Sequence, residues 1–379
     1  PMTNPILPGA TLGVLGSGQL GRMFAIAARR LGYGVHVYSP EVNTPAGQVA
    51  DREFAAEYDD LVQLAEFARS VDVVTFEFEN VPAEVTDCIQ KHCPVHPSGS
   101  VLAVAQNRIR EKSTLRDAGL AVPEFREVTS AEQLRSAVSE LGTPSVVKTA
   151  SSGYDGKGQA VIHDPDQVDE IWTSLATDQA ILEQFVEFDC ELSVVGARNS
   201  LGEFVHYGPF RNSHTDHILD VTVCPSGLSD DVNERAVDVA RRVFECLDVV
   251  GVLCVELFVT TDGRILINEI APRPHNSGHL TIDAHKTCQF EQQVRAICGL
   301  PLGNAEQHAD AAMANILGDL WNESEPHWPA LLASDVKLHL YGKAEARPGR
   351  KMGHITALAD SIEDADKNVR AARESLLNK

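Results

Sequence analysis

Two glutamates, Glu256 and Glu269, flank a predicted β-hairpin and could together hold a cation. Between them, Asp262-Gly263 is the strongest short signal for a two-residue type I′ turn. Such a turn pairs Thr261 with Arg264, and counting outward then places Glu256 directly opposite Glu269. Opposed residues on one face of a sheet have Cβ atoms about 5 Å apart, where like charges repel. The pair therefore predicts a compensating cation.

The expected cation is Mg²⁺, with Mn²⁺ as an alternative, because both ligands are carboxylates and the surrounding strand residues are apolar. Mg²⁺ commonly takes one or two protein carboxylates and completes its shell with substrate phosphates. A three-residue turn is the alternative to this interpretation. It would shift the register by one residue and turn Glu256 and Glu269 to opposite faces.

A glycine-rich segment, SSGYDGKG at residues 151–158, follows the predicted strand SVVKTA. Its three glycines allow the backbone to fold over a ligand and to direct N–H groups at phosphate oxygens. Lys157 adds a positive charge within the segment, and Lys148 lies on the preceding strand. The spacing is not that of a Walker A loop, and an ordinary glycine-rich turn is the alternative. Together with the carboxylate pair, this segment indicates an enzyme that uses ATP.

The opening glycine motif, Gly16-x-Gly18-x-x-Gly21, lies between a predicted strand and a predicted helix, as in dinucleotide-binding folds. The second strand, GVHVYSP, does not end in the acidic residue that would hold an NAD ribose. A nicotinamide oxidoreductase is therefore a weak alternative function. Close packing of the strand against the helix is another explanation for the three glycines.

Polar side chains lie at the same predicted sheet edge as this motif. Gln19 follows the second glycine, and the third strand, VVTFEFEN, ends in Glu77, Glu79 and Asn80. The carboxyl ends of parallel strands meet at one edge, and Glu77 and Glu79 share a face by the two-residue period. We therefore expect these residues to form a wall of a ligand site, with solvated strand ends as the alternative.

Three further groups of polar residues could contribute to a site. His214 and His217 invite a zinc interpretation, but no third ligand of suitable spacing is near, and a single histidine that reaches a phosphate is preferred. Arg273 and His275, in PRPHNSGH, directly follow the strand of Glu269 and would face whatever lies beside the metal. A basic cluster near the C-terminus predicts an anion clamp, with a solvated turn as the alternative; its members are Lys343, Arg347, Arg350 and Lys351.

The elements that must position these residues alternate in type over the first hundred positions. This alternation predicts parallel βαβ units of the Rossmann-like type; the strands are 11–16, 34–40 and 71–80, and the helices are 19–32, 60–70 and 81–92. A single helix is expected at 101–119. Residues 190–270 read as mainly β with one helix at 230–248, and short strands and a charged helix follow Pro301.

The composition is that of a globular protein with an acidic surface. Its 379 residues suffice for two or three domains, and the formal net charge of −22 argues against nucleic acid as the main partner. Eight cysteines without a C-x-x-C pair fit a reduced, cytoplasmic protein better than a disulfide scaffold. We find no apolar run near the roughly 18 residues of a membrane span and no signal peptide, so no membrane association is expected.

These motifs coincide, in order and over essentially the whole chain, with those of a known family. The chain resembles the N5-carboxyaminoimidazole ribonucleotide synthetases, which belong to the ATP-grasp superfamily and act in purine biosynthesis; the matching segments are GSGQLGRM, TFEFEN, QNRIREK, SSGYDGKGQ, EQFVEF, INEIAPRPHNSGH and LYGKAEARPGRKMGH. The resemblance implies a homodimer of mixed α/β and α+β fold. Its expected domains are a Rossmann-like N-terminal domain (1–106), an ATP-grasp domain (107–300) with a mobile lid at about 120–188, and a small β-rich C-terminal domain (301–379).

The implied reaction joins 5-aminoimidazole ribonucleotide to bicarbonate, with ATP converted to ADP and phosphate through carboxyphosphate. The resemblance places Mg²⁺ at Glu256 and Glu269. Within the implied ATP site, basic side chains would contact the phosphates, backbone groups of residues 183–186 would read the adenine edge, and Glu191 would bind the ribose. The whole implied ATP site is Arg108, Lys148, Ser151, Ser152, Gly153, Tyr154, Asp155, Gly156, Lys157, Glu183, Gln184, Phe185, Val186, Glu191, His214, Asn268 and Glu269.

Catalytic roles are expected of four residues. Asp155 would accept the proton of the substrate amine, and Tyr154 would help to position the imidazole ring. Arg273 and His275 would orient the carboxyl donor and the substrate. The other expected substrate contacts are Gln19 and Glu79 on one side of the ribonucleotide, and Lys343 and Arg350 at its 5′-phosphate.

Two positions depart from the pattern usual in that family. Ser152 stands where glycine is usual, and a glycine is the more usual neighbour at Asp216-His217. Within the superfamily, formate-dependent glycinamide ribonucleotide transformylase shares the ELFV and PRPH motifs and is the rival activity.

Overall fold

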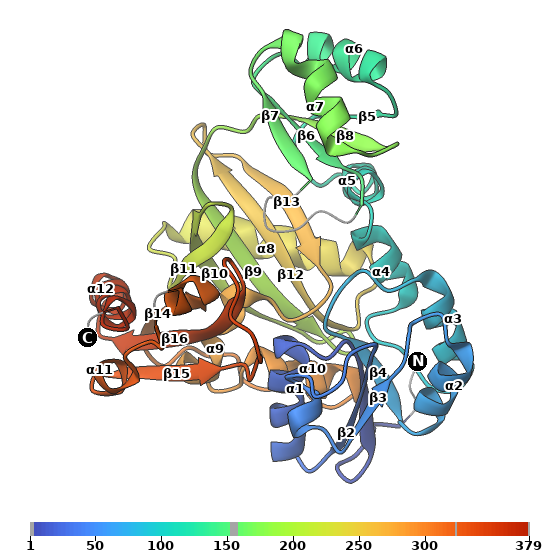
Figure 1. The fold of residues 1–379 in the computed structure, drawn as a ribbon, viewed down its shortest axis with the longest axis vertical. Coiled ribbons are helices and arrows are strands. Elements are labelled where there is room, and N and C mark those ends of the chain that lie inside the picture. The colour runs from blue at the N-terminus through green and yellow to red at the C-terminus, as the bar shows by residue number, and fades with distance from the viewer. Residues whose placement is uncertain (1–3, 152–157, 323, 378–379) are drawn as a thin grey trace.

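The computed structural model describes residues 4–151, 158–322 and 324–377. Three sheets organise this part of the chain (Figure 1). The segment Ser152–Lys157, which contains the expected catalytic residues Tyr154 and Asp155, lies outside the described residues.

The N-terminal sheet is parallel and has the strand order β3-β2-β1-β4. Helices α1 and α10 pack on one face, and α2 and α3 pack on the other. This is the Rossmann-like arrangement that the alternating elements predict, with β3 as a strand that the sequence analysis does not contain. The bounds are β1 Thr11–Leu15, α1 Gln19–Arg30, β2 Gly34–Ser39, β3 Arg52–Ala55, α2 Leu61–Arg69, β4 Val73–Phe76, α3 Ala83–Gln90 and α10 Gln289–Ile297.

The central sheet is antiparallel and eight-stranded, in the order β13-β12-β9-β10-β11-β14-β16-β15. Helix α8 packs on one face of β9 and β12 over an apolar core, and this leaves the opposite face for a cleft. The bounds are β9 Phe188–Arg198, β10 Phe204–Thr215, β11 Ile218–Cys224, α8 Asp230–Cys246, β12 Gly251–Thr260, β13 Ile265–Ala271 and α9 Thr281–Ala284.

The C-terminal strands continue this same sheet, because β14 pairs with β11 and then with β16. Helix α12 packs over β14 and β16, and its apolar residues share one core with theirs. The domain boundary expected at residue 301 stays a prediction, and the sheet runs across it without a break. The bounds are β14 Asp310–Leu317, α11 Trp328–Leu332, β15 Val336–Leu340, β16 Lys351–Ala359 and α12 Ile362–Glu374.

The third sheet has the antiparallel order β5-β8-β6-β7 and lies at the top of Figure 1, at the end of the molecule farthest from the N-terminal domain. Helices α6 and α7 cover one face through a core that includes Val147 and Leu182. Side chains alternate across a strand, so Val146, Lys148 and Glu183 face the cleft instead. The bounds are β5 Phe125–Val128, α6 Ala131–Leu141, β6 Ser145–Thr149, β7 Gln159–Ile162, α7 Val168–Leu175 and β8 Ala180–Gln184.

The prediction of one helix at 101–119 is wrong, because the structure has two: α4 (Gly99–Ala105) and α5 (Arg108–Asp117). The side chain of Asn107 accepts hydrogen bonds from the backbone N–H groups of Ile109 and Arg110 and so caps α5. Arg108 N donates to Ala150 O (2.8 Å), which ties the start of α5 to the end of β6. The break places Arg108 at the edge of the cleft.

Across the described residues, we find no helix with both the length and the apolar character that crossing a bilayer requires.

Candidate active site

The predicted opposition of Glu256 and Glu269 is confirmed, although the turn is not the predicted one. Thr260 N donates to Arg264 O (2.9 Å), which closes a turn of three residues. That register alone would turn the two glutamates to opposite faces. A bulge in β13 skips Asn268 and restores the pairing of Glu256 with Glu269.

The same bulge adds a residue to the cleft. In a regular strand, Asn268 and Glu269 would point to opposite faces of the sheet. Both line the cleft, together with Glu256 and Phe258 of β12. The bulge therefore gathers polar oxygen atoms at one place, as bulges near functional sites commonly do.

Each glutamate of the pair contacts a basic side chain from another segment. Arg108 Nη1 lies 3.0 Å from Glu269 Oε2, and His275 Nε2 lies 2.8 Å from Glu256 Oε1. Burial alone would raise the pKa of Glu269, but Arg108 and secondarily Lys148 and His275 together outweigh burial and hold that pKa below its ordinary value. Glu269 is therefore ionised at neutral pH and can serve as a metal ligand.

The donor set fits a hard divalent cation. Both ligands are carboxylates, and within the described ranges no third His, Cys, Asp or Glu joins them in a metal-binding group. Mg²⁺ typically completes such a pair with phosphate and water oxygens. The same finding leaves the zinc interpretation of His214 and His217 without a third ligand.

Two lysines and one glutamate form a buried charge network beside the pair. Lys148 Nζ lies 2.7 Å from Glu183 Oε2, and Lys112 Nζ lies 3.7 Å from Glu183 Oε1. Burial would raise the pKa of Glu183, but the two lysines lower it to about 2. Lys112 Nζ also donates to the carbonyl oxygens of Ile267 and Asn268. The network therefore links the lid sheet to the bulged strand of the pair.

Glu191 and His214 form a further pair on the floor of the cleft. Glu191 on β9 hydrogen-bonds His214 Nδ1 on β10. Burial would lower the pKa of His214, but the hydrogen bond and charge of Glu191 raise it. Because Glu191 also holds this imidazole, its expected role as ribose ligand remains a prediction.

The turn at Asp216 and His217 explains one departure from the family pattern. Thr215 pairs with Ile218, so these two residues form a two-residue hairpin turn. Their φ angles are +50° and +63°, which is the left-handed region that a type I′ turn requires and that favours glycine. His217 lines the cleft from this strained position.

The opening glycine motif already has an anion of its own. The side chain of Glu77 accepts hydrogen bonds from the backbone N–H groups of Gly18 and Gly21, the latter at 2.8 Å. A Cβ added to Gly18 would lie 2.7 Å from Glu77 Oε1. A dinucleotide pyrophosphate would need this same space at the start of α1. The oxidoreductase alternative therefore loses its binding site.

The other wall of the cleft carries the expected ribonucleotide contacts. Arg273 Nε lies 2.8 Å from Glu79 Oε1, and Gln19 lies nearby at the start of α1. The three segments that supply these residues are far apart in the sequence and meet only in the folded chain.

The basic cluster near the C-terminus reaches the cleft through a different residue from the two expected. Lys351 lines the cleft, whereas Lys343 and Arg350 are not among its lining residues. Lys343 Nζ donates to Lys351 O (2.6 Å), and Arg350 Nη1 donates to Glu345 O (2.8 Å). Burial, and secondarily the charge of Arg350, lower the pKa of Lys343 to about 8. The 5′-phosphate role of Lys343 and Arg350 stays a prediction.

The structure brings most of the expected site residues into one cleft of about 780 Å³. Those that line it are Gln19, Glu79, Arg108, Lys148, Ser151, Glu183, Gln184, Phe185, Val186, Glu191, His214, Glu256, Asn268, Glu269, Arg273 and His275. Ser152, Gly153, Tyr154, Asp155, Gly156 and Lys157 lie outside the described residues.

Sequence reasoning missed Glu111 and the aromatic pair Phe188–Phe258, which line the cleft, and Lys112, which is buried behind it in contact with Glu183. Glu111 and Lys112 end the motif QNRIREK, from which only Arg108 was selected, so their signal was present. The rings of Phe188 and Phe258 are stacked with centroids 4.7 Å apart and offer a flat apolar surface in the cleft.

Comparison with known proteins bears on this cleft directly. Three family models match successive parts of the chain: the ribonucleotide synthetase preATP-grasp domain at 9–106, the ATP-grasp domain at 113–290, and the phosphoribosylaminoimidazole carboxylase C-terminal domain at 311–368. A relative from Bacillus subtilis (strain 168), named N5-carboxyaminoimidazole ribonucleotide synthase, is 41% identical over 93% of this chain and 92% of its own length. The chain belongs to the N5-carboxyaminoimidazole ribonucleotide synthase family.

Solved structures of N5-carboxyaminoimidazole ribonucleotide synthetases share this fold. One, an ADP complex, is 42% identical with a TM-score of 0.92 and covers 98% of each chain. Another, from Aspergillus clavatus in complex with ADP and 5-aminoimidazole ribonucleotide, is 29% identical with a TM-score of 0.89 and covers 97% of this chain and 98% of its own. The predicted fold class and family are confirmed. As a family member, the chain is an ATP-grasp ligase that carboxylates 5-aminoimidazole ribonucleotide at the expense of ATP in purine biosynthesis.

Proposed function

We propose that the cleft activates bicarbonate with ATP, and that Glu256 and Glu269 hold the Mg²⁺ ion that accompanies the nucleotide. The observation that carries this proposal is the register of β12 and β13, which opposes two carboxylates in a cleft that Lys148 and Arg108 also line. Bound there, Mg²⁺ would offset negative charge on the β- and γ-phosphates.

The nucleotide would lie between the lid sheet and the central sheet. Arg108, Lys148 and His214 are the basic residues that we assign to its phosphates, and each already contacts a carboxylate. Phe185 and Val186 lie just past the end of β8, where backbone groups can read an adenine edge. The solved ADP complexes of related synthetases support a nucleotide in this cleft.

The ribonucleotide would lie against the N-terminal domain. Gln19 and the Glu79–Arg273 pair would contact the sugar side, while His275, held between Glu256 and Ser277 Oγ, would orient the reacting carboxyl group. Lys343 and Arg350 are assigned to the 5′-phosphate. The relative that was solved with 5-aminoimidazole ribonucleotide supports a substrate of this class.

The proposed reaction has two steps. A bicarbonate oxygen attacks the γ-phosphorus of ATP, the bond to the β-phosphate oxygen breaks, and ADP and carboxyphosphate form, with Lys148 and Arg108 stabilising the transferred charge. The exocyclic amine of the ribonucleotide then attacks the carboxyl carbon and phosphate leaves. Asp155 would take the amine proton, and Tyr154 would position the ring.

The decisive experiment measures ADP release and product together. We expect ADP release to require both 5-aminoimidazole ribonucleotide and bicarbonate, and ¹³C-bicarbonate to yield a carbamate carbon signal on the product. Glycinamide ribonucleotide with formate is the matched control and should give no ADP above background. Turnover with that control pair, or product without label from bicarbonate, would refute the proposal.

The role of Asp155 needs its own test. Asp155→Asn should abolish product formation while the Kd for ADP changes less than about threefold, because proton acceptance and nucleotide binding use different groups. Unchanged turnover would remove Asp155 from this role.

The homodimer is also a proposal that rests on membership of the family. Light scattering coupled to size-exclusion chromatography should give twice the 41.1 kDa mass of one chain, and a mass of one chain would contradict it.

A further inference from the structure

A second pocket of about 560 Å³ lies beside the N-terminal half of β10 and shares no lining residue with the substrate cleft. Of the residues of β10, only 211–215 pair with β11. The earlier residues of β10 therefore have β9 on one side, and on the other side the described chain leaves a gap in the sheet. This gap is the pocket, and its volume is in the range of small-molecule sites.

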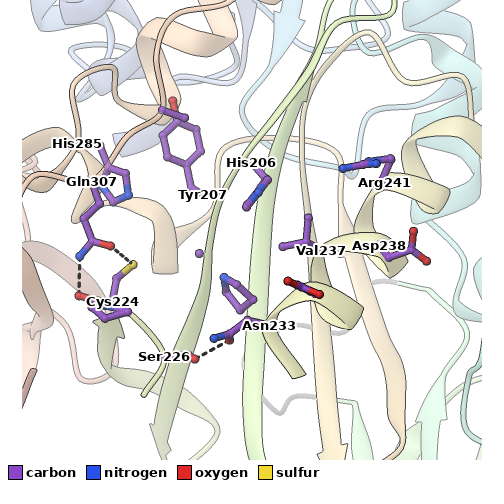
Figure 2. Close-up of a pocket in the computed structure, with 15 residues that line it drawn as sticks. His206, Tyr207, Cys224, Ser226, Asn233, Val237, Asp238, Arg241, His285 and Gln307 are labelled. Atoms are coloured by element: carbon purple, nitrogen blue, oxygen red, sulfur yellow. Dashed lines mark hydrogen bonds between the residues drawn. The ribbon is translucent and has the colours of Figure 1, made fainter. Parts of the chain in front are cut away.

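Figure 2 shows how side chains from three parts of the fold enclose the pocket. His285, Gln307 and Cys224 form one wall, and side chains of α8, including Val237, form the other. His206 of β10 lies between the two walls. The walls are thus built on a strand, a helix and a segment that crosses from α9 toward β14, all of which are fixed by the core.

His285 is the residue that points to a ligand. Its side chain is 6% exposed and lines the pocket, yet within the described part of the chain its buried Nδ1 has no hydrogen-bond partner. Burial, and secondarily His308, lower its pKa to about 4, so the imidazole is neutral at physiological pH. A buried polar atom without a partner is costly in a folded protein. A bound molecule would satisfy it.

The other polar groups of the pocket are largely satisfied by one another. Gln307 accepts a hydrogen bond from the thiol of Cys224 and donates to two backbone carbonyls, and Asn233 accepts one from Ser226. Burial lowers the pKa of His206, so this second imidazole is neutral as well. The hydrogen-bonding capacity left for a ligand therefore comes from two neutral imidazoles, whose buried Nδ1 atoms both have no partner among the described residues.

The shape and charge of the pocket narrow the ligand class. The imidazole ring of His285 lies at the pocket, and the buried ring of Tyr207 packs edge-on behind it at a centroid distance of 5.3 Å. At the rim, Glu234 and Asp238 outnumber Arg241, on a chain whose net charge is −22. Such a rim disfavours a phosphate group, whereas neutral imidazoles that offer donors and acceptors suit a planar, uncharged molecule.

We propose that this pocket is a second ligand site, which binds an uncharged nitrogen heterocycle of the size of a purine base. Its ring would lie against Val237, and its ring N–H and nitrogen or oxygen acceptors would pair with His285 and His206. The site is independent of the chemistry proposed for the cleft, because the two share no residue.

The test is isothermal titration calorimetry with hypoxanthine as the probe, on the full chain saturated with ADP and Mg²⁺ so that the nucleotide site is blocked. We expect one site per chain with a Kd of about 10 µM to 1 mM, as for a small ligand with few hydrogen bonds. Val237→Trp should fill the pocket and weaken binding at least tenfold. Glu245→Trp, which adds the same ring to an exposed position of α8 outside the pocket, should leave the Kd unchanged.

His285→Phe provides a second variant in case Val237→Trp fails to fold. It keeps a ring of similar size and removes the hydrogen-bonding atoms, so we expect at least fivefold weaker binding. Inosine monophosphate should bind this pocket at least tenfold more weakly than hypoxanthine. No binding of hypoxanthine, equal affinity in Val237→Trp, or tighter binding of the phosphate-bearing nucleotide would each overturn the proposal. So would a change of oligomeric state in Val237→Trp without any binding of the base, since a second copy would then occupy the pocket.

Discussion

The N-terminal glycine loop and the central cleft both carry sequence patterns of a ligand site, and the two sites differ in what occupies them in the folded chain. In the loop, Glu77 of the chain itself accepts the N–H groups of Gly18 and Gly21. In the cleft, Glu256 and Glu269 oppose each other, and basic side chains that a substrate can displace contact both. A motif therefore identifies groups that are able to bind a ligand. The rest of the fold decides whether a side chain of the protein already binds those groups.

The acid groups of the two regions also differ in their ionisation. Burial raises the pKa of Glu77, because two backbone N–H groups and the charges of Arg273 and Lys343 offset burial only in part. The pKa of Glu183 in the cleft falls to about 2, because Lys112 and Lys148 bring full positive charges to this buried carboxylate. The close lysine charges keep Glu183 strongly ionised, whereas the positive charges near Glu77 do not outweigh its burial.

The largest effect is expected on turnover when a carboxylate of the proposed metal pair is removed. Glu269→Gln should lower turnover by about 10²–10³-fold, because one carboxylate of the proposed metal pair and the ionic partner of Arg108 are lost together. Steady-state ADP release at saturating Mg²⁺ measures this. Glu245→Gln, an exposed carboxylate on α8, is the matched control and should keep full turnover. If turnover of Glu269→Gln falls less than threefold, the metal assignment is wrong.

A smaller effect is expected on acid stability. A folded-state pKa of about 2 lies below the ordinary glutamate value of 4.5, so Glu183 stabilises the fold above pH 4.5 and loses this contribution as the pH falls toward 2. The contribution is about 3 kcal/mol. Urea unfolding should therefore show a gap of this size between the wild type and Glu183→Gln at pH 7 that shrinks steadily below pH 4.5. A gap independent of pH would contradict the ionised state of Glu183.

Removing the chain's own anion should expose the N-terminal loop. Glu77→Ala leaves the N–H groups of Gly18 and Gly21 without an acceptor and should cost about 2 kcal/mol of unfolding free energy. Sulfate should then raise the melting temperature of this variant more than that of the wild type, because the start of α1 becomes an anion site. Sodium chloride at the same ionic strength is the control that separates sulfate binding from a general effect of salt on the melting temperature. Equal gains in both proteins would show that Glu77 does not occupy an anion site.

A double-mutant cycle sharpens this result. A Cβ at Gly18 would meet the Glu77 carboxylate at 2.7 Å, so Gly18→Ala should destabilise the wild type. In the Glu77→Ala background the same substitution should cost less, because the obstructing carboxylate is gone. If the two substitutions lower the free energy of unfolding additively, the Glu77 carboxylate is not what excludes a side chain at Gly18.

The smallest effect is expected at the strained turn of the cleft. His217→Gly should raise the free energy of unfolding by about 0.5–1 kcal/mol, because relief of the left-handed conformation exceeds the extra backbone entropy of glycine. The midpoint of urea unfolding measures this gain. A lower midpoint would mean that contacts of the His217 side chain outweigh the strain of its backbone.

The fold could be predicted where the signal is local. The alternating elements of the first hundred residues give the parallel sheet correctly, whereas β3 and β14 were missed and the helix at 101–119 was not divided. The side chain of Asn107 caps α5. In the sequence, a single polar residue within a helical pattern is only a weak signal that one helix ends and another begins. The C-terminal strands could be recognised as strands, but their membership of the central sheet depends on pairing with β11, far away in sequence.

The sequence by itself determined the acidic pair, because Glu256 and Glu269 lie on the two strands of one hairpin and the pairing is local. Even there the reasoning succeeded through two compensating features, a longer turn and the bulge at Asn268. Only the tertiary structure decided that Glu77 fills the glycine loop 59 residues before it, and that Lys112, Lys148 and Glu183 converge. Such contacts form only when packed sheets and helices bring distant segments together. A short-range sequence pattern does not indicate which distant side chain will make the contact.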